Sequence, residues 1–228
     1  MNLEKIIVII EYEPEKAGIS MKTVPYFSQW ESRQLVSDFL SGKLHPADDP
    51  LWHLSGAVDR DEYAQWSFHI CGMACLKMLL AHWHNRIIPT IELMKQCRDY
   101  GGYVVHEDGS IKGLFYRPFV SFIAERYALQ AEVKEHTPIE EIYDLLDQGY
   151  VYIASVHPTI RTPEMTPPKQ GGHLVYVFGR DTQRQELIFH NPSGNTATSQ
   201  ENVHLSCEVF ARFYAKRGIL IKDSRASV

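Results

Sequence analysis

The stretch from Cys71 to Trp83, CGMACLKMLLAHW, limits the possible folds more than any other part of the sequence. Apart from Lys77 and His82, its residues are small or apolar, and they cover more than one face of a helix. A helix that is apolar on nearly all sides needs neighbours on nearly all sides. The sequence therefore predicts a helix over residues 71–83 that is buried in the middle of a domain.

The signals further along the chain change from helix to strand. Four segments rich in β-branched and aromatic residues read as strands, and they cover residues 150–156, 172–179, 185–190 and 218–223. The segment RDTQRQ, residues 180–185, is typical of the loop of an antiparallel hairpin. Helices first and an antiparallel sheet second indicate an α+β fold, with an N-terminal helical part and a C-terminal sheet.

Two further helices are expected around these strands. Residues 136–150 carry a capping box of Thr137 and Glu140, Pro138 in the first turn, and Gly149 as the stop. Residues 206–218 are expected to form another helix, for which Ser206 is the candidate N-cap.

Length and composition favour one domain. The chain has 228 residues, of which 44% are hydrophobic, enough for one substantial core. We expect a single domain over residues 1–228, with residues 1–21 as an N-terminal extension because Met21 is an alternative start. The polar, proline-punctuated residues 31–64 are expected to be an insertion that contains a short helix or two.

Charge and cysteine content exclude several classes of function. A formal charge of −5 and a pI near 6.1 give no general attraction to nucleic acid or to anionic membranes. The four cysteines lie on or near apolar segments, which favours a reducing compartment. The sequence contains no apparent targeting segment or membrane span, so a cytoplasmic location is expected. The oligomeric state cannot be predicted.

Three residues in a particular order suggest nucleophilic catalysis. Cys71 stands where a helix is expected to begin, and the helix dipole favours a thiolate there. His173 begins a predicted strand after two glycines, and Asn191 ends the next strand. An imidazole within hydrogen-bond distance can activate a cysteine, and an Asn can fix the tautomer of that imidazole. Each residue alone has an ordinary structural explanation, since a cysteine at the edge of an apolar helix is usually just buried.

Four motifs in this order resemble a known family. The segments VPYFSQW, CGMACLKMLL, GGHLVYVFGRD and IFHNPSG resemble the bacteriocin-processing double-glycine peptidases. They resemble still more closely the "peptidase family thirty-nine-like" group of stand-alone bacterial proteins. The resemblance covers roughly residues 22–30 and 65–222. It implies a papain-like fold and a cysteine peptidase that acts on a peptide or amide bond through a thioacyl intermediate, without metal or organic cofactor.

The resemblance also implies residue roles, with Cys71 as nucleophile, His173 as general base and Asn191 as the residue that orients the imidazole. The family more often has Asp at this third position, and Asn stabilises an imidazolium less. The oxyanion donor stays open. Gln29 matches the family's SQ by context, which slightly favours it, whereas Gln65 has the six-residue spacing to Cys71.

Other interpretations of the same residues remain. The domain could be a catalytically silent peptide binder or a transglutaminase-like acyltransferase. A zinc site is less well supported, because no second ligand pair follows the nearby set, which comprises His69, Cys71, Cys75, His82 and His84. The proline-rich residues 157–172 directly before His173 form either a mobile flap over the site or a long connection.

Overall fold

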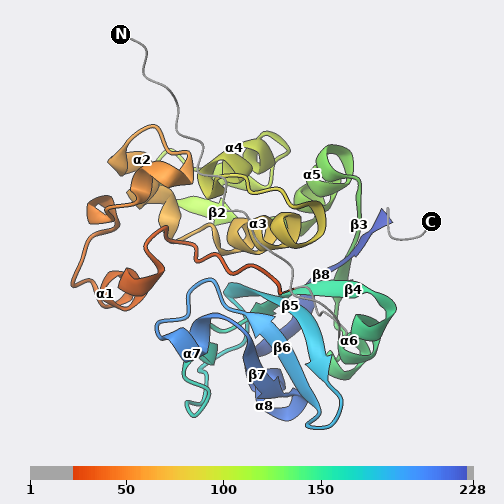
Figure 1. Ribbon diagram of the computed structural model, residues 1–228. Coiled ribbons are helices and arrows are strands. Elements are labelled where there is room, and N and C mark those ends of the chain that lie inside the picture. Colours follow the sequence, from red (N-terminus) through yellow and green to blue (C-terminus); the bar gives the residue numbers. More distant parts are fainter. Residues whose placement is uncertain (1–22, 225–228) are drawn as a thin grey trace, which may run out of the picture.

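A computed structural model describes residues 23–224, and the expected apolar helix lies at its centre (Figure 1). This helix, α3 (Cys71–His84), buries every side chain from Gly72 to Ala81, including that of Lys77. The Lys77 ammonium is 3.6 Å from the Glu31 carboxylate, which offsets the cost of burying a charge. The prediction of a buried central helix is confirmed.

Two helices and a small hairpin surround α3 on the side away from the main sheet. They are α4 (Thr90–Asp99), α5 (Tyr116–Tyr127) and the antiparallel pair β1 (Tyr103–Val105) and β2 (Ile111–Gly113). The α5 face that packs into the core consists of Phe119, Phe122, Ile123 and Tyr127.

The main sheet has six strands in the order β3-β8-β4-β5-β6-β7, and every pair is antiparallel. The strands are β3 (Leu129–Glu135), β4 (Tyr150–Val156), β5 (His173–Asp181), β6 (Glu186–His190), β7 (Val203–Ser206) and β8 (Tyr214–Asp223). The four predicted strands and the hairpin between β5 and β6 are confirmed, whereas β3 and β7 were not predicted.

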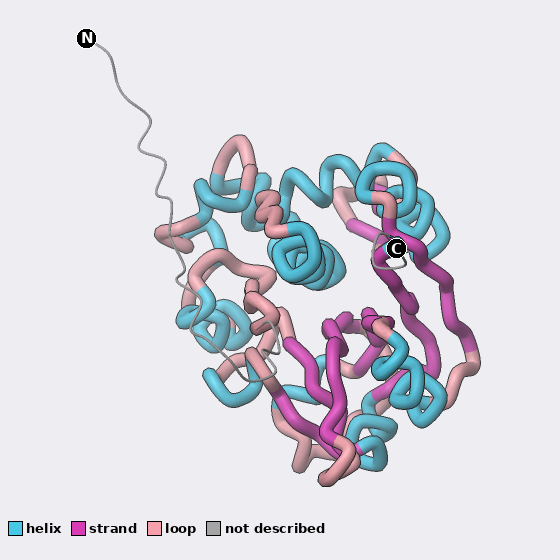
Figure 2. Tube along the Cα trace, turned by 45° about the vertical axis from the view of Figure 1, so that its right-hand side comes forward, coloured by secondary structure: helices cyan, strands magenta, loops and turns pink. Residues whose placement is uncertain are grey.

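The two faces of the sheet belong to two hydrophobic clusters. Ile153, Tyr176 and Ile219 face the cluster that contains α3, α4 and α5. Their neighbours along the strands, such as Ala154 and Val175, face the opposite cluster. That cluster includes α6 (Ile139–Leu145) and α8 (Cys207–Phe213). Figures 1 and 2 show the strands as one curved layer with helices on both sides. The predicted α+β class is confirmed.

Two helix predictions need correction. The helix predicted from residue 136 begins at Ile139, and Thr137 makes no capping box, because its hydroxyl donates to Glu135 O and its N–H donates to Lys216 O. Gly149 does end this region, with a φ of 79° after η4 (Leu146–Gln148). The helix predicted over residues 206–218 ends at Phe213, although Ser206 caps it as expected by accepting the Val209 N–H.

The segment of residues 31–64 consists of short helical turns. They are η1 (Arg33–Leu35), α1 (Val36–Ser41), η2 (Pro46–Asp48), η3 (Trp52–Ser55) and the start of α2 (Arg60–Ser67). The buried Asp49 carboxylate ties these turns together by accepting from Ser32 and the Tyr63 hydroxyl. That this segment is an insertion, and that the chain is one domain, stay predictions. The expected extension of residues 1–21 lies outside the described residues.

Candidate active site

Cys71 lies at the first position of α3, where its thiol borders a pocket. The helix begins as predicted, with Ile70 O accepting the N–H groups of Met73 and Ala74. The half-buried Cys71 lines a pocket of about 720 Å³. The next residue, Gly72, is closely packed. A Cβ built on it would lie 2.8 Å from the side chain of Leu114 and 3.0 Å from that of Leu174, so a larger residue would crowd them.

The electrostatic environment of the Cys71 thiol is dominated by burial. Burial raises its pKa, and hydrogen bonding from the N–H groups of Leu174 and Gly72 opposes this rise without cancelling it. The start of α3 and the neighbouring strand β5 therefore both supply donors, but the resting group is a thiol and not a thiolate. A thiol in this position needs a base close by before it can act as a nucleophile.

His173 lines the same pocket as Cys71. It is the first residue of β5 and pairs in register with Val156 of β4, so its backbone is held by the sheet. Gly171 and Gly172 precede it with φ values of 81° and 101°, a region that side chains rarely adopt. The two glycines thus let the chain turn sharply into the strand and place the imidazole at its edge.

The hydrogen bonds of Asn191 define the tautomer of His173. The Nε2 atom of His173 is 2.8 Å from Asn191 Oδ1, which also accepts the Ser193 N–H at 3.1 Å. Because a backbone N–H needs an acceptor, Oδ1 is the amide oxygen and Nε2 carries the imidazole proton. The Nδ1 atom is then the basic nitrogen, and it takes part in none of the described hydrogen bonds.

Ser193 and Arg161 extend this arrangement and were not predicted from the sequence. Ser193 Oγ is 3.0 Å from His173 Nε2, and it accepts a hydrogen bond from Arg161 Nη2 at 3.1 Å. A signal for Ser193 was available, because an Asn followed two residues later by a backbone N–H that it can bind is a common turn. Arg161 has no such local signal.

The pKa of His173 is lowered to about 4. Burial is the largest cause, the charge of Arg161 adds to it, and the hydrogen bond to Asn191 opposes it. His173 is 6% exposed. At neutral pH the imidazole is therefore a neutral base that lines the same pocket as the protonated Cys71 thiol.

The two candidate glutamines have different surroundings. Gln29 is buried, and its Nε2 donates to Ser67 O at 2.8 Å, at the end of α2. Its backbone N–H donates to Pro192 O, directly after Asn191. Gln65 lies on α2 with an exposed side chain, and neither glutamine is among the residues that line the pocket. The structure thus brings Gln29, and not Gln65, between the turn before α3 and the turn at Asn191.

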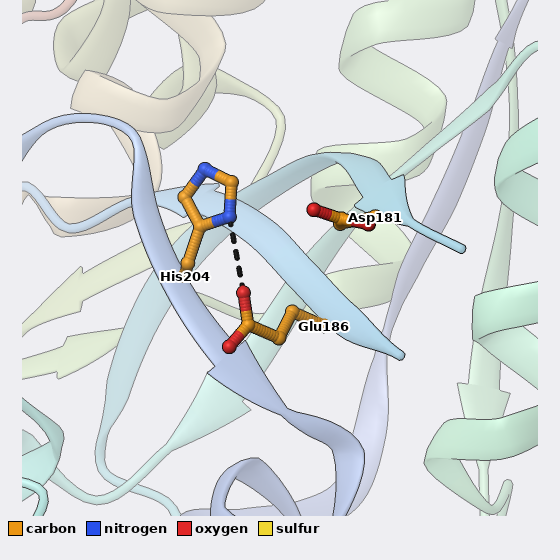
Figure 3. Close-up of side chains that lie close together, drawn as sticks. All are labelled: Asp181, Glu186 and His204. Carbon is orange, nitrogen blue, oxygen red and sulfur yellow. Dashed lines mark ion pairs between the residues drawn. The ribbon is translucent and has the colours of Figure 1, made fainter. Parts of the chain in front are cut away.

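The considered zinc ligands do not converge. Among the described residues, the group of His, Cys, Asp and Glu side chains that meets a metal-like spacing is Asp181, Glu186 and His204, with ligand atoms within 4.8 Å of one another. Figure 3 shows Glu186 and His204 facing each other, and their Oε2 and Nδ1 atoms are 3.3 Å apart. Asp181 Oδ1 accepts the N–H groups of Gln183 and Arg184 in the hairpin turn. The proximity of these three side chains is therefore explained by their contacts within the protein.

The segment of residues 157–172 is attached to its surroundings at several points. It contains η5 (Pro158–Arg161), and Arg212 donates to the carbonyl oxygens of Pro163 and Met165. Gln170 Nε2 donates to Ala211 O. The flap hypothesis stays a prediction.

Two solved structures resemble this chain at low sequence identity, whereas no curated protein matches it. One is the peptidase domain of Streptococcus ComA, a bifunctional ABC transporter involved in a quorum-sensing pathway. It has 17% identity and a TM-score of 0.47 over 68% of this chain and 92% of that one. Another is a "putative C39-like peptidase from Bacillus anthracis", with 14% identity and a TM-score of 0.47 over 67% and 88% of the two chains.

Within residues 23–224, no helix combines the length and the apolar character that a bilayer crossing requires. The model of the Peptidase_C39 like family matches residues 58–220, a range that includes Cys71, His173 and Asn191 but not Gln29. The match covers more than half of the chain and agrees with the resemblance of the sequence motifs, and the chain therefore belongs to the Peptidase_C39 like family.

Proposed function

We propose that this protein is a cysteine peptidase or amide hydrolase that uses Cys71, His173 and Asn191. The observation that carries the proposal is the 2.8 Å bond between His173 Nε2 and Asn191 Oδ1, on an imidazole that shares a pocket with Cys71. The bond leaves Nδ1 as a base, which is the group that a protonated thiol requires. Family membership supports the same chemistry.

In the first half of the reaction, His173 Nδ1 removes the Cys71 proton as the sulfur attacks the carbonyl carbon of the substrate. The carbonyl oxygen becomes an oxyanion, and the Cys71 N–H and Gln29 Nε2 donate hydrogen bonds to it. Gln29 uses one of its two N–H groups for Ser67 O, so the other is left for this purpose. His173 then gives the proton to the departing amine, and the C–N bond breaks.

In the second half, water replaces the amine. His173 Nδ1 takes a proton from the water, whose oxygen attacks the thioester carbon, and the returning proton restores the Cys71 thiol. Asn191 holds the imidazole in one orientation and one tautomer through both halves. Ser193 shares the Nε2 proton, and the charge of Arg161 disfavours a lasting imidazolium.

The proposal is tested by trapping the intermediate. A mixed peptide library is incubated with the protein, quenched in acid within seconds, and analysed by mass spectrometry for an acyl group on the Cys71-containing fragment. We expect an acyl adduct together with cleaved peptides. An adduct that passes to an added amine in preference to water identifies an acyltransferase. Bound peptides with neither adduct nor cleavage identify a silent binding domain and overturn the proposal.

The two glutamines provide a matched test of the oxyanion site. Replacing Gln29 with Ala should lower kcat by about 10²-fold, because removing one oxyanion donor costs roughly that much. Gln65→Ala should leave kcat at the wild-type value, because its side chain is exposed on α2, whereas that of Gln29 is buried. Steady-state kinetics on one cleaved peptide measure both effects, with thermal melting to confirm that Gln29→Ala is folded. A loss of kcat in Gln65→Ala alone would reverse the assignment.

A further inference from the structure

The pocket beside Cys71 extends to a polar end that the proposed chemistry does not use. Its apolar part is formed by Leu114, Phe115 and Leu174. Its polar part combines the start of α5 with the ends of β3, β4 and β8, and these elements supply Tyr116, Arg117, Glu135, Ser155 and Arg217.

Arg217 and Ser155 approach the same point of the chain. A Cβ built on Gly171 would lie 3.2 Å from Ser155 Oγ and 3.3 Å from Arg217 Nη2. Gly171 is two residues before His173, so this pair of donors lies next to the segment that leads to the proposed base. Ser155 is 2% exposed and pairs with Leu174 in the sheet, which fixes its position.

Tyr116 is the third polar group at this end. Burial raises the pKa of its hydroxyl, and hydrogen bonding to Ser155 together with the charge of Arg217 opposes that rise. The guanidinium, the serine hydroxyl and the tyrosine hydroxyl are therefore close enough to influence one another. All three can donate hydrogen bonds to one acceptor group.

The charge of the pocket is opposite to the charge of the chain. Arg117 and Arg217 contribute two positive charges to the lining and Glu135 contributes one negative charge, whereas the whole chain carries −5. Burial lowers the pKa values of His69 and His173, so both line the pocket as neutral groups at pH 7. The ion pairs described for residues 23–224 include neither arginine. Arg217 hydrogen-bonds the Tyr116 hydroxyl. Glu135 lies opposite Arg217 in the register of β3 and β8, but the two are not joined.

The geometry points to a carboxylate-binding subsite formed by Arg217, Ser155 and Tyr116, which selects substrates with an acidic group near the bond to be cleaved. A guanidinium binds a carboxylate through two parallel hydrogen bonds, and hydroxyl donors complete the set. This inference rests on the proposed function for its meaning, but its binding component can be measured without catalysis. The carboxylate comes from an Asp or Glu side chain or from a free C-terminus.

The test uses a library of hexapeptides in matched pairs. Each pair has Glu or Gln at one position, and each member is made with a free or an amidated C-terminus. The peptides are passed over immobilised Cys71→Ala protein, and the retained fraction is measured by mass spectrometry. We expect at least about tenfold enrichment of the carboxylate members, roughly the 1.4 kcal/mol of one charge-assisted interaction. Enrichment of Glu over Gln indicates a side chain, and enrichment of free over amidated peptides indicates a C-terminus.

Variants that change the enrichment in opposite directions make the test specific. Arg217→Gln should abolish the enrichment, Arg217→Lys should reduce it, and Glu135→Gln should increase it. Arg184→Gln removes an exposed arginine from the β5–β6 turn and should leave the enrichment ratio unchanged. Equal retention of carboxylate and amide peptides by the Cys71→Ala protein overturns the inference, even where the wild-type protein cleaves peptides. Enrichment without cleavage by the wild type supports the subsite and counts against the hydrolase.

Discussion

Replacing Cys71 with alanine should lower peptide hydrolysis by at least about 10³-fold, and His173→Ala should cause a loss of similar size. Without the sulfur no thioacyl intermediate forms, and without Nδ1 of His173 the thiol keeps its proton, because burial raises the pKa of Cys71. Groups that act as one unit give losses that do not add, so the double variant should be no slower than either single variant by more than a small factor. The measurement is kcat/KM on one cleaved peptide, with circular dichroism to establish folding.

A second cysteine supplies the matched control. Cys207 is also partly buried at the first position of a helix, α8, but it does not line the pocket. Cys207→Ala should retain wild-type kcat/KM. Activity that survives Cys71→Ala but is lost in Cys207→Ala would move the nucleophile to α8, and activity that survives both changes would exclude a cysteine mechanism.

The central helix and the sheet could be predicted because their signals do not depend on distant residues. The residues of α3 are apolar around the whole circumference, so burial follows from composition alone. In the same way β4 has six buried residues after Tyr150, of which only Ser155 is not hydrophobic, and this run is recognisable without knowing its neighbours. Elements of this kind can be predicted from their own residues alone.

The capping box at Thr137 failed because tertiary contacts replaced a local one. The Thr137 N–H donates to Lys216 O near the start of β8, which holds the residue outside the helix. The strand β3 was not predicted for a related reason. It is an edge strand in which only Leu129 is fully buried, so its sequence LQAEVKE lacks the apolar character of a strand, and its pairing with β8 determines its structure.

The order of the three candidate site residues along the chain could be recognised in the sequence. The residues that surround them, and the burial that changes their pKa values, could not. Cys71 and His173 each begin an element and line the pocket, and Asn191 directly follows the end of β6. Arg161 contacts Ser193 across 32 residues, and no spacing rule predicts that contact. The buried environment that raises the pKa of Cys71 and lowers that of His173 likewise comes from packing, which is why a local argument from the helix dipole predicted the wrong direction for the thiol.

Acidification should destabilise the fold well above the pH at which most carboxylates titrate. The pKa values of His173 and His190 are lowered from 6.5 to about 4, mainly by burial. His190 is fully buried, its Nδ1 accepts the Asn202 N–H at 3.0 Å, and its Nε2 is 2.9 Å from Val24 O. A second proton on this ring would have to break the bond to Asn202, so the neutral form is built into the structure.

The sign of the effect follows from where the protons bind. Below pH 6.5 the unfolded chain takes up protons on both histidines, whereas the folded protein does so only near pH 4. The contribution of these two histidines to the free energy of unfolding should therefore be constant above about pH 7 and fall as the pH drops from 6.5 towards 4. At pH 5 the loss should be about 2 kcal/mol per histidine, from 1.36 kcal/mol for each unit below the unfolded pKa.

Urea unfolding at pH 7, 6, 5.5 and 5 measures this loss, and His173 and His190 should together contribute about two protons per molecule to the uptake on unfolding near pH 5. His204→Gln provides the control, because His204 is exposed and its replacement removes no buried imidazole, so the slope between pH 6.5 and 5 should stay nearly unchanged. His190→Gln should lower the stability at pH 7 but reduce the slope by about half, since one of the two buried groups no longer titrates. A free energy of unfolding that stays constant from pH 7 to 5 would mean that both rings accept protons in the folded protein at pKa values near 6.5, which would contradict the lowered pKa values of His173 and His190.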